Sequence, residues 1–239
     1  MKKVRTGILQ RIVSRLGDAI FPAVCECCGR SLVDGEEILC LYCLHDLPRT
    51  NYHKDSFNEL HKRLAAPKVP IEHAASMFHY IKDSRFALLV QRAKYNNRPI
   101  IIRHLARIFA KELYDDHFFD DINLILPIPL HWRKKLKRGF NQSEEIAKSI
   151  SEISKIKYGD NLKARPHSTQ TRKNAIERAA NMEGTIYVCN SDELAGLHVL
   201  IVDDVMTTGA TILTAAKAIL KASPSTRISV LTLASSKQL

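Results

Sequence analysis

Two adjacent carboxylates and a hydroxyl-rich glycine turn are the residues of this sequence best suited to chemistry. Asp203 and Asp204 follow the apolar run 199–202, and the turn 207–211 places three threonines around Gly209. Apolar residues at helical spacing come next, so the turn is expected to open a helix. Backbone N–H groups at a helix start are unpaired and lie at the positive end of the helix dipole, which favours an anion. Gly209 lets the backbone approach closely and the threonines add hydroxyl donors, so the turn suits a phosphate.

The two acids need a different role, because carboxylates repel a phosphate. They can accept hydrogen bonds from sugar hydroxyls or hold a hydrated Mg²⁺ ion. The sequence therefore predicts one loop that recognises a sugar and its phosphate together, with Asp203 and Asp204 as the candidate catalytic residues. The simpler alternative is a buried strand whose end carries solvated acids before an ordinary threonine-capped helix.

Two strands are expected to position these groups. Four apolar residues in a row, 199–202, are typical of a strand that is buried on both faces, as in a parallel sheet. A second apolar run, Ile122–Leu126, ends in prolines that forbid further ladder pairing inside a sheet. After it, Asn141 is placed to cap the next helix.

The loop between the second strand and that helix is strongly basic. Because parallel strands share their carboxyl edge, we expect this loop to lie beside the acid pair and to hold a second polyanionic group. A solvated charge run is the alternative. The basic residues of the loop are Arg133, Lys134, Lys135, Lys137 and Arg138.

Four cysteines near the N-terminus predict a structural zinc site. Cys25, Cys28, Cys40 and Cys43 form two paired C-x₂-C knuckles, which supply four thiolates for tetrahedral zinc. A site closed by four cysteines folds its module and does no chemistry. Cys27 lies inside the first knuckle and competes for the same role, so one ligand stays open at this point.

Composition limits the classes of protein to consider. The chain has 239 residues, 45% of them hydrophobic, and a formal net charge of +11. That size allows one good core plus a small appendage, and that charge favours polyanionic partners. We expect an N-terminal helix, zinc module and connector over residues 1–66 and a second domain over 67–239. No run approaches the roughly 20 apolar residues of a membrane helix, so a cytoplasmic protein is expected.

The acidic strand end and its turn, 199–211, resemble the signature with which type I phosphoribosyltransferases bind phosphoribosyl pyrophosphate (PRPP). The order of the motifs along the chain resembles one smaller family more closely. The paired CxxC knuckles, then Pro-Ile-Pro with Arg-Gly-Phe-Asn-Gln, then Val-Asp-Asp-Val-Met-Thr-Thr-Gly-Ala-Thr resemble the ComF/GntX family. The segment 168–184 is similar to that family's Gln…Arg…Asn loop.

The resemblance implies an α/β fold of the type I phosphoribosyltransferase kind, with a parallel sheet flanked by helices and an N-terminal zinc-ribbon-like module. It implies Mg²⁺ bound together with PRPP, and a mobile flap over residues 165–183. The PRPP-binding residues that it implies are Asp203, Asp204, Val205, Met206, Thr207, Thr208, Gly209, Ala210, Thr211, Arg133, Lys135 and Arg138.

Two functions follow from the resemblance. The first is a PRPP-binding protein of DNA uptake and natural competence, which binds single-stranded DNA and works with other uptake machinery. The second is an active, amidophosphoribosyltransferase-like enzyme that acts on an unidentified acceptor in nucleotide or sugar metabolism. Candidate nucleic-acid contacts are Lys134, Lys137, Arg172, Lys173 and Arg178, with Tyr42, Tyr52, Trp132 and Phe140 as possible stacking aromatics.

Overall fold

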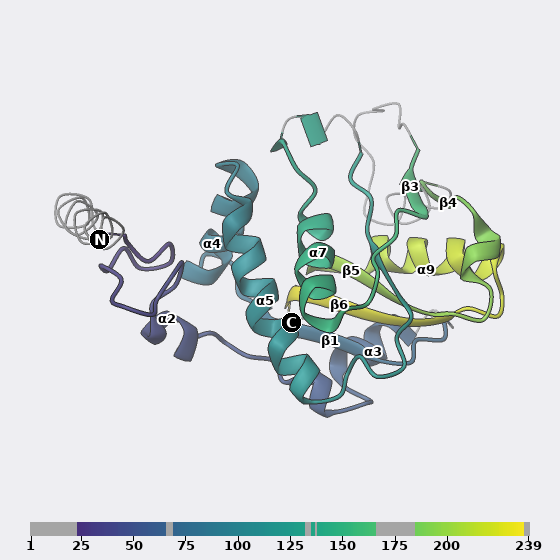
Figure 1. Ribbon diagram of the computed structural model, residues 1–239, viewed down its shortest axis with the longest axis horizontal. Coiled ribbons are helices and arrows are strands. Elements are labelled where there is room, and N and C mark those ends of the chain that lie inside the picture. The colour runs from purple at the N-terminus through teal and green to yellow at the C-terminus, as the bar shows by residue number, and fades with distance from the viewer. Residues whose placement is uncertain (1–22, 66–68, 132–134, 137, 166–184, 237–239) are drawn as a thin grey trace, which may run out of the picture. The chain divides into compact units, whose positions relative to one another are not determined.

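The computed structural model describes residues 23–65, 69–131, 135–136, 138–165 and 185–236. These residues fall into two compact units, one that ends at Leu47 and one that begins at Pro48. Figure 1 shows the elements of both, and each unit is described by itself below. No helix in the described ranges has the length and apolar character that crossing a bilayer requires.

The first unit is held together by turns more than by regular structure. In its described part, helix α2 spans Leu41–His45, and Val24 bridges Ser31 in an antiparallel pair. The Gly29 N–H donates to the Cys25 carbonyl over 2.8 Å, which closes a tight turn around the first cysteine pair. Few apolar residues between 23 and 47 are buried, so a cross-link such as a metal would add to the stability of this part.

The second unit is built on a parallel sheet. Its strands are β1 (Ala74–Tyr80), β2 (Leu124–Pro127), β5 (His198–Met206) and β6 (Arg227–Ser236), in the spatial order β1-β6-β5-β2. All three pairings are parallel. Strand β5 lies in the middle and is buried on both faces, as its four apolar residues predict.

Helices cover both faces of this sheet (Figure 1). Helices α4 (Arg85–Tyr95), α5 (Pro99–Asp115) and α7 (Gln142–Ser154) lie on one face, and α3 (Glu59–Ala65) and α9 (Ala210–Ala222) on the other. Proline at the first turn opens α5, and the side chain of Asn141 caps α7 by accepting from the Ser143 N–H. The predicted cap is therefore confirmed.

A second, two-stranded sheet lies beyond β2. Strands β3 (Leu162–Ala164) and β4 (Ile186–Val188) pair antiparallel, and the short 3₁₀ helix η2 (Ser191–Leu194) leads from β4 to β5. Tyr158 bridges Ile125, so the chain that precedes β3 covers the outer edge of β2. The site described below therefore lies between the main sheet and this small one.

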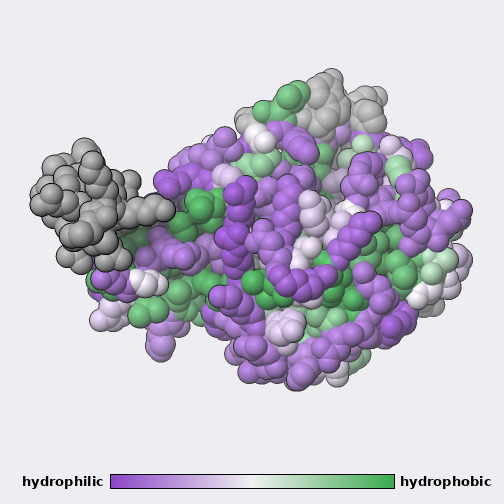
Figure 2. Space-filling view, in the orientation of Figure 1, coloured by the Kyte–Doolittle hydropathy of each residue, from purple (hydrophilic) through white to green (hydrophobic). Residues whose placement is uncertain are grey.

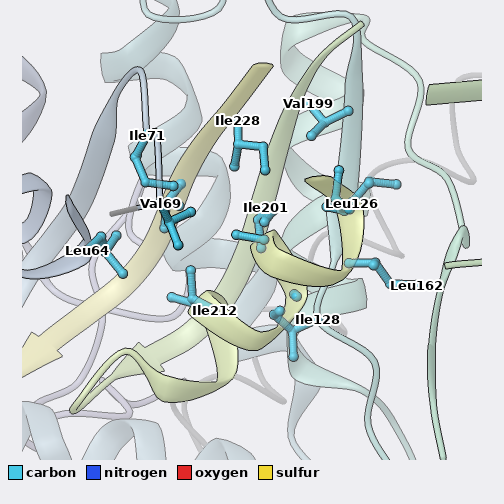
Figure 3. Packing of buried hydrophobic residues seen from close by; sticks show 14 of the residues in the cluster. Leu64, Val69, Ile71, Leu126, Ile128, Leu162, Val199, Ile201, Ile212 and Ile228 are labelled. Atoms are coloured by element: carbon cyan, nitrogen blue, oxygen red, sulfur yellow. The ribbon is translucent and has the colours of Figure 1, made fainter. Parts of the chain in front are cut away.

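One apolar cluster joins α3, α9 and the face of the sheet that these two helices cover (Figure 3). Leu64, Ile201 and Ile212 contribute from these three elements, and each is 1% exposed or less. Figure 2 shows that the outer face of the second unit is mostly hydrophilic, with scattered apolar residues. Scattered exposed apolar residues are normal and need no partner.

Residues 48–65, which the sequence grouped with the N-terminal module, pack within the second unit. The 3₁₀ helix η1 (Tyr52–Lys54) lies against β1, and the nearly buried side-chain amide of Asn58 donates to the Ala74 carbonyl over 2.8 Å. His53 Nε2 lies 2.9 Å from a carboxylate oxygen of Asp116, the residue that caps the C-terminus of α5. The division of the structure thus differs from 1–66 and 67–239 at these residues, because polar contacts to β1 and α5 hold them.

Candidate functional site

A pocket of about 440 Å³ opens where the carboxyl ends of β2 and β5 meet. It lies at the edge where open parallel sheets bind their ligands. The acid pair forms one wall, the start of α7 another, and strands β3 and β4 a third. The lining residues are Ile128, Pro129, Leu130, His131, Arg138, Asn141, Gln142, Ser143, Ala164, Arg165, Thr185, Ile186, Asp203, Asp204, Val205 and Thr211.

The two carboxylates have different partners. Asp203 Oδ1 accepts from the Ser143 hydroxyl and from the Asp204 N–H, both over 2.9 Å. Asp204 Oδ2 lies 2.7 Å from the ammonium nitrogen of Lys94, at the end of α4. One acid is thus neutralised by a cation, while the hydrogen-bond donors to the other, among the described residues, are neutral.

Burial and the neighbouring charge make Asp203 hard to ionise. Loss of solvent around the strand end, followed by the repulsion of the Asp204 carboxylate, raises the pKa of Asp203 to about 7. The Ser143 hydroxyl, the Asp204 N–H and the more distant Lys94 charge lower it only in part. A sugar hydroxyl or a hydrated cation placed here would relieve the same repulsion, so the site is prepared for such a partner.

The turn after β5 is open. Gly209 has φ +81°, a left-handed conformation that side chains other than glycine rarely adopt, and Thr207 and Thr208 are exposed. The Ala210 N–H donates to the hydroxyl of Thr208 within the same turn, over 3.4 Å. Within the described ranges no protein acceptor lies in hydrogen-bond range of the amides of Thr207, Thr208, Gly209 or Thr211. These amides are therefore available to an anion.

The basic loop contributes less than the sequence predicts, as far as the described residues go. Arg138 lines the pocket and donates to Gln142 Oε1 over 3.2 Å. Lys135 is absent from the pocket wall and lies 3.4 Å from Glu144. The other basic residues lie outside the described residues, as do the candidate nucleic-acid contacts: Arg133, Lys134, Lys137, Arg172, Lys173 and Arg178.

Four pocket groups were not predicted as site residues. Lys94 and Ser143 hold the acid pair, and Arg165 adds a second guanidinium to the wall. Gln142 is 2% exposed, and its side-chain nitrogen has no acceptor in the described part of the chain. That nitrogen is a donor left over for a ligand oxygen. Lys94 lies in the last turn of α4, and nothing near it in the sequence indicates its contact with Asp204. The other three carry no signal outside the family likeness.

The aromatic residues divide by exposure. Tyr42 is 67% exposed under the Arg30 guanidinium, as a stacking residue requires. Phe140 is 8% exposed and belongs to the buried residues, so its ring is not available to stack on bases. Tyr52 is half-buried, and Trp132 lies outside the described residues. An unpredicted aromatic, Tyr95, is 68% exposed next to Lys94.

In the first unit, four cysteines form a cluster suited to a metal. The sulfur atoms of Cys25, Cys28, Cys40 and Cys43 all lie within 4.8 Å of one another. Burial opposes ionisation of Cys25, but the backbone N–H groups of Cys40, Cys28 and Cys27 outweigh it and lower the pKa of Cys25 to about 7. The donor set and its spacing fit a zinc-ribbon module, and Cys27 is not part of the cluster.

Residues 92–238 match the family model described as "Phosphoribosyl transferase domain". The match covers more than half of the chain and contains both strands that line the pocket. The chain belongs to the phosphoribosyl transferase domain family. This membership, with the parallel sheet and its helices, confirms the predicted fold class.

Curated relatives place the chain in the ComF group of this family. "Competence protein F" of Haemophilus influenzae is 31% identical over 140 residues, 56% of this chain and 60% of that protein. "DNA utilization protein YhgH" of Escherichia coli O157:H7 is 26% identical over 203 residues, 83% of this chain and 84% of that protein. "Competence protein ComFC" of Bacillus subtilis is 29% identical over 125 residues, 52% of this chain and 48% of that protein. The ComF resemblance is thereby confirmed.

Removing the Asp203 charge is expected to stabilise the protein, although it disrupts the acid pair of the pocket. The raised pKa means that the folded state keeps a proton that the unfolded state loses, so stability from this group falls as pH rises from about 4 to about 7. Asp203→Asn should therefore increase the free energy of unfolding at pH 8 by about 2 kcal/mol and have little effect at pH 4. Denaturant unfolding at both pH values measures this.

Asp120→Asn is the matched control, since that side chain is 70% exposed and its substitution should change stability by less than about 0.5 kcal/mol. An Asp203→Asn protein that is less stable than the wild type at pH 8 would contradict the assignment of an unfavourable buried charge.

Proposed function

We propose that the second unit binds PRPP together with Mg²⁺ at the pocket between β2 and β5. One observation carries this proposal: an incompletely neutralised acid pair lies directly before a turn in which the amides of Thr207, Thr208, Gly209 and Thr211 have no acceptor among the described residues. Acids that suit sugar hydroxyls and amides that suit a phosphate thus meet on one loop. A sugar phosphate is the ligand that uses both.

Each end of the ligand has its own group of residues. The amides and hydroxyls of the turn 207–211 would take the 5-phosphate. Asp203 and Asp204 would accept from the ribose hydroxyls or hold the hydrated Mg²⁺. Arg138, Arg165 and the free donor of Gln142 line the rest of the pocket and would face the pyrophosphate. Bound Mg²⁺ would neutralise pyrophosphate charge, as it does at phosphate sites in general.

The same residues suit a transfer reaction, which makes an active phosphoribosyltransferase the alternative function. Departure of pyrophosphate leaves positive charge on the ribose, and a site for that step needs positioning and fixed charges more than a nucleophile. The acid pair would stabilise the positive ribose, and the two arginines would stabilise the leaving group. No residue set for a particular acceptor stands out among the pocket-lining residues.

We further propose that this chain acts in DNA uptake and handles single-stranded DNA. The relatives' names refer to competence and to DNA utilization, and the chain carries a net charge of +11. Tyr95 supports a contact with bases. Its ring is largely exposed, and the guanidinium of Arg138 lies 5.9 Å from the ring centre, at the rim of the PRPP pocket. An exposed aromatic beside a cation is the usual platform for an unpaired base.

We assign Zn²⁺ to the four-cysteine cluster. Four thiolates around a closed site stabilise a small fold and leave no position for a substrate. The role of the metal is therefore structural, and the first unit would unfold without it.

PRPP affinity tests the first proposal. The double variant Asp203→Asn, Asp204→Asn should bind PRPP·Mg²⁺ at least about tenfold more weakly than the wild type, measured by isothermal titration calorimetry. The substitution keeps the size of both side chains, removes their charge and exchanges one acceptor oxygen of each for an NH₂ donor. The control Asp160→Asn removes a carboxylate that is 91% exposed and should leave affinity unchanged. Equal affinities for the double variant and the wild type would refute PRPP binding at this edge.

Oligonucleotide binding tests the DNA proposal. Tyr95→Ala should weaken binding of an oligo-dT strand by about fivefold or more, because stacking contributes roughly 1–3 kcal/mol per base, while Tyr95→Phe should bind as the wild type does. Tyr114→Ala is the control, since Tyr114 is 56% exposed on α5. Fluorescence anisotropy at two salt concentrations measures these affinities. A loss shared equally by both alanine variants would argue against a specific contact at Tyr95.

Single substitutions of Cys28 and Cys27 test which of the two is a zinc ligand. Cys28→Ser should lower the zinc content of the purified protein well below that of the wild type, whereas Cys27→Ser should retain it. Inductively coupled plasma mass spectrometry measures the zinc, and thermal unfolding should show loss of stability in Cys28→Ser only. Retention of zinc by Cys28→Ser with loss in Cys27→Ser would assign the ligand to Cys27 and overturn the cluster.

A further inference from the structure

Arg63, which the sequence assigned to the connector, contacts the turn 207–211, the proposed site of the 5-phosphate. We call this turn the phosphate turn. The Arg63 side chain comes from α3, far from the turn in sequence. Its Nη1 donates to the Ser236 carbonyl over 2.7 Å, and its Nη2 donates to the Thr207 carbonyl. The Ser236 hydroxyl donates to the same Thr207 carbonyl over 3.3 Å. One carbonyl of the turn is therefore fixed by two donors.

Fixing this carbonyl sets the direction of an amide that faces the ligand. The peptide unit is planar and trans, so the N–H of one residue points opposite to the carbonyl of the residue before it. The Thr207 carbonyl points toward Arg63, and the N–H of Thr208 must therefore point away from α3. That N–H belongs to the set with no protein acceptor among the described residues.

Helix α3 contacts the turn at a second point. Leu64 is completely buried in the cluster with Ile212, the second residue after Ala210 at the start of α9 (Figure 3). A side-chain carbon added to Gly209 would lie 3.2 Å from a methyl carbon of Leu64. Arg63 and Leu64 thus lie against the turn at two points, Thr207 and Gly209.

We propose that Arg63 is a positioning residue that orients the amides of the turn toward the 5-phosphate of the ligand. The inference rests on the proposed function and adds a selectivity to it. Arg63 acts on the turn after β5, whereas the residues proposed for the pyrophosphate, Arg138, Arg165 and Gln142, lie elsewhere in the pocket wall. Loss of Arg63 should therefore weaken binding of a sugar phosphate and spare pyrophosphate.

The experiment compares two probes on the full chain. Arg63→Met should weaken ribose 5-phosphate binding by about tenfold, the size expected when a charge-assisted hydrogen bond is lost, and change pyrophosphate·Mg²⁺ affinity by less than about twofold. Arg63→Lys keeps one cationic donor and should recover part of the loss. Lys62→Met is the control, because Lys62 is exposed on the same helix and its partners among the described residues are Glu59, at 3.0 Å, and the Phe57 ring.

A ligand-free measurement separates positioning from direct contact with the phosphate. In Arg63→Met without ligand, the backbone ¹⁵N order parameters of residues 207–211 should be lower than in the wild type, while those of β5 stay the same. Unchanged order parameters in the turn would overturn the positioning role, and so would equal loss of both probes.

The results for the wild type distinguish failure of this inference from failure of the proposed function. If the wild type binds neither probe, the PRPP proposal fails and this inference fails with it. If the wild type binds ribose 5-phosphate and Arg63→Met binds it equally well, only the role of Arg63 is refuted.

Discussion

The repulsion between two carboxylates at the end of a buried strand is the interaction on which the rest of this site depends. Strand β5 carries Asp203 and Asp204 to an edge with little solvent, where both cannot be ionised without compensation. Lys94 from α4 and Ser143 from α7 approach that edge from the helical layer on one face. They compensate part of the carboxylate charge. Charge left uncompensated in a protein interior is costly, and it persists where a ligand completes the compensation.

The helices on the opposite face of the sheet position the turn after β5. Helix α3 contributes Arg63 and Leu64 to the phosphate turn, and α9 begins at the turn itself. The acids are therefore set by one helical layer and the amides by the other. This division explains why a segment that resembles a connector in sequence belongs to the second unit: without residues 59–65 the turn would lose its outer support.

The local features of the site were predictable, and the long-range ones were not. The strand at 199–202, the helix that the turn 207–211 opens and the Asn141 cap follow from apolar runs, periodicity and capping chemistry, which act between near neighbours. Lys94 reaches Asp204 across more than a hundred residues, and Arg63 reaches Thr207 across a greater distance still. Such pairs have no local signal. The sequence could not decide whether Phe140 stacks on bases, because a motif says which residues are present and the long-range packing decides whether a ring is buried.

The central claim is that the amides of the turn and the acid pair receive one sugar phosphate. Backbone ¹H–¹⁵N NMR of the wild type, titrated with PRPP and Mg²⁺, tests it directly because each amide reports separately. We expect saturable shifts at Thr207, Thr208, Gly209 and Thr211 together with Asp204, as the free N–H groups gain an acceptor. Shifts confined to other parts of the chain, or none at saturating ligand, would contradict the account.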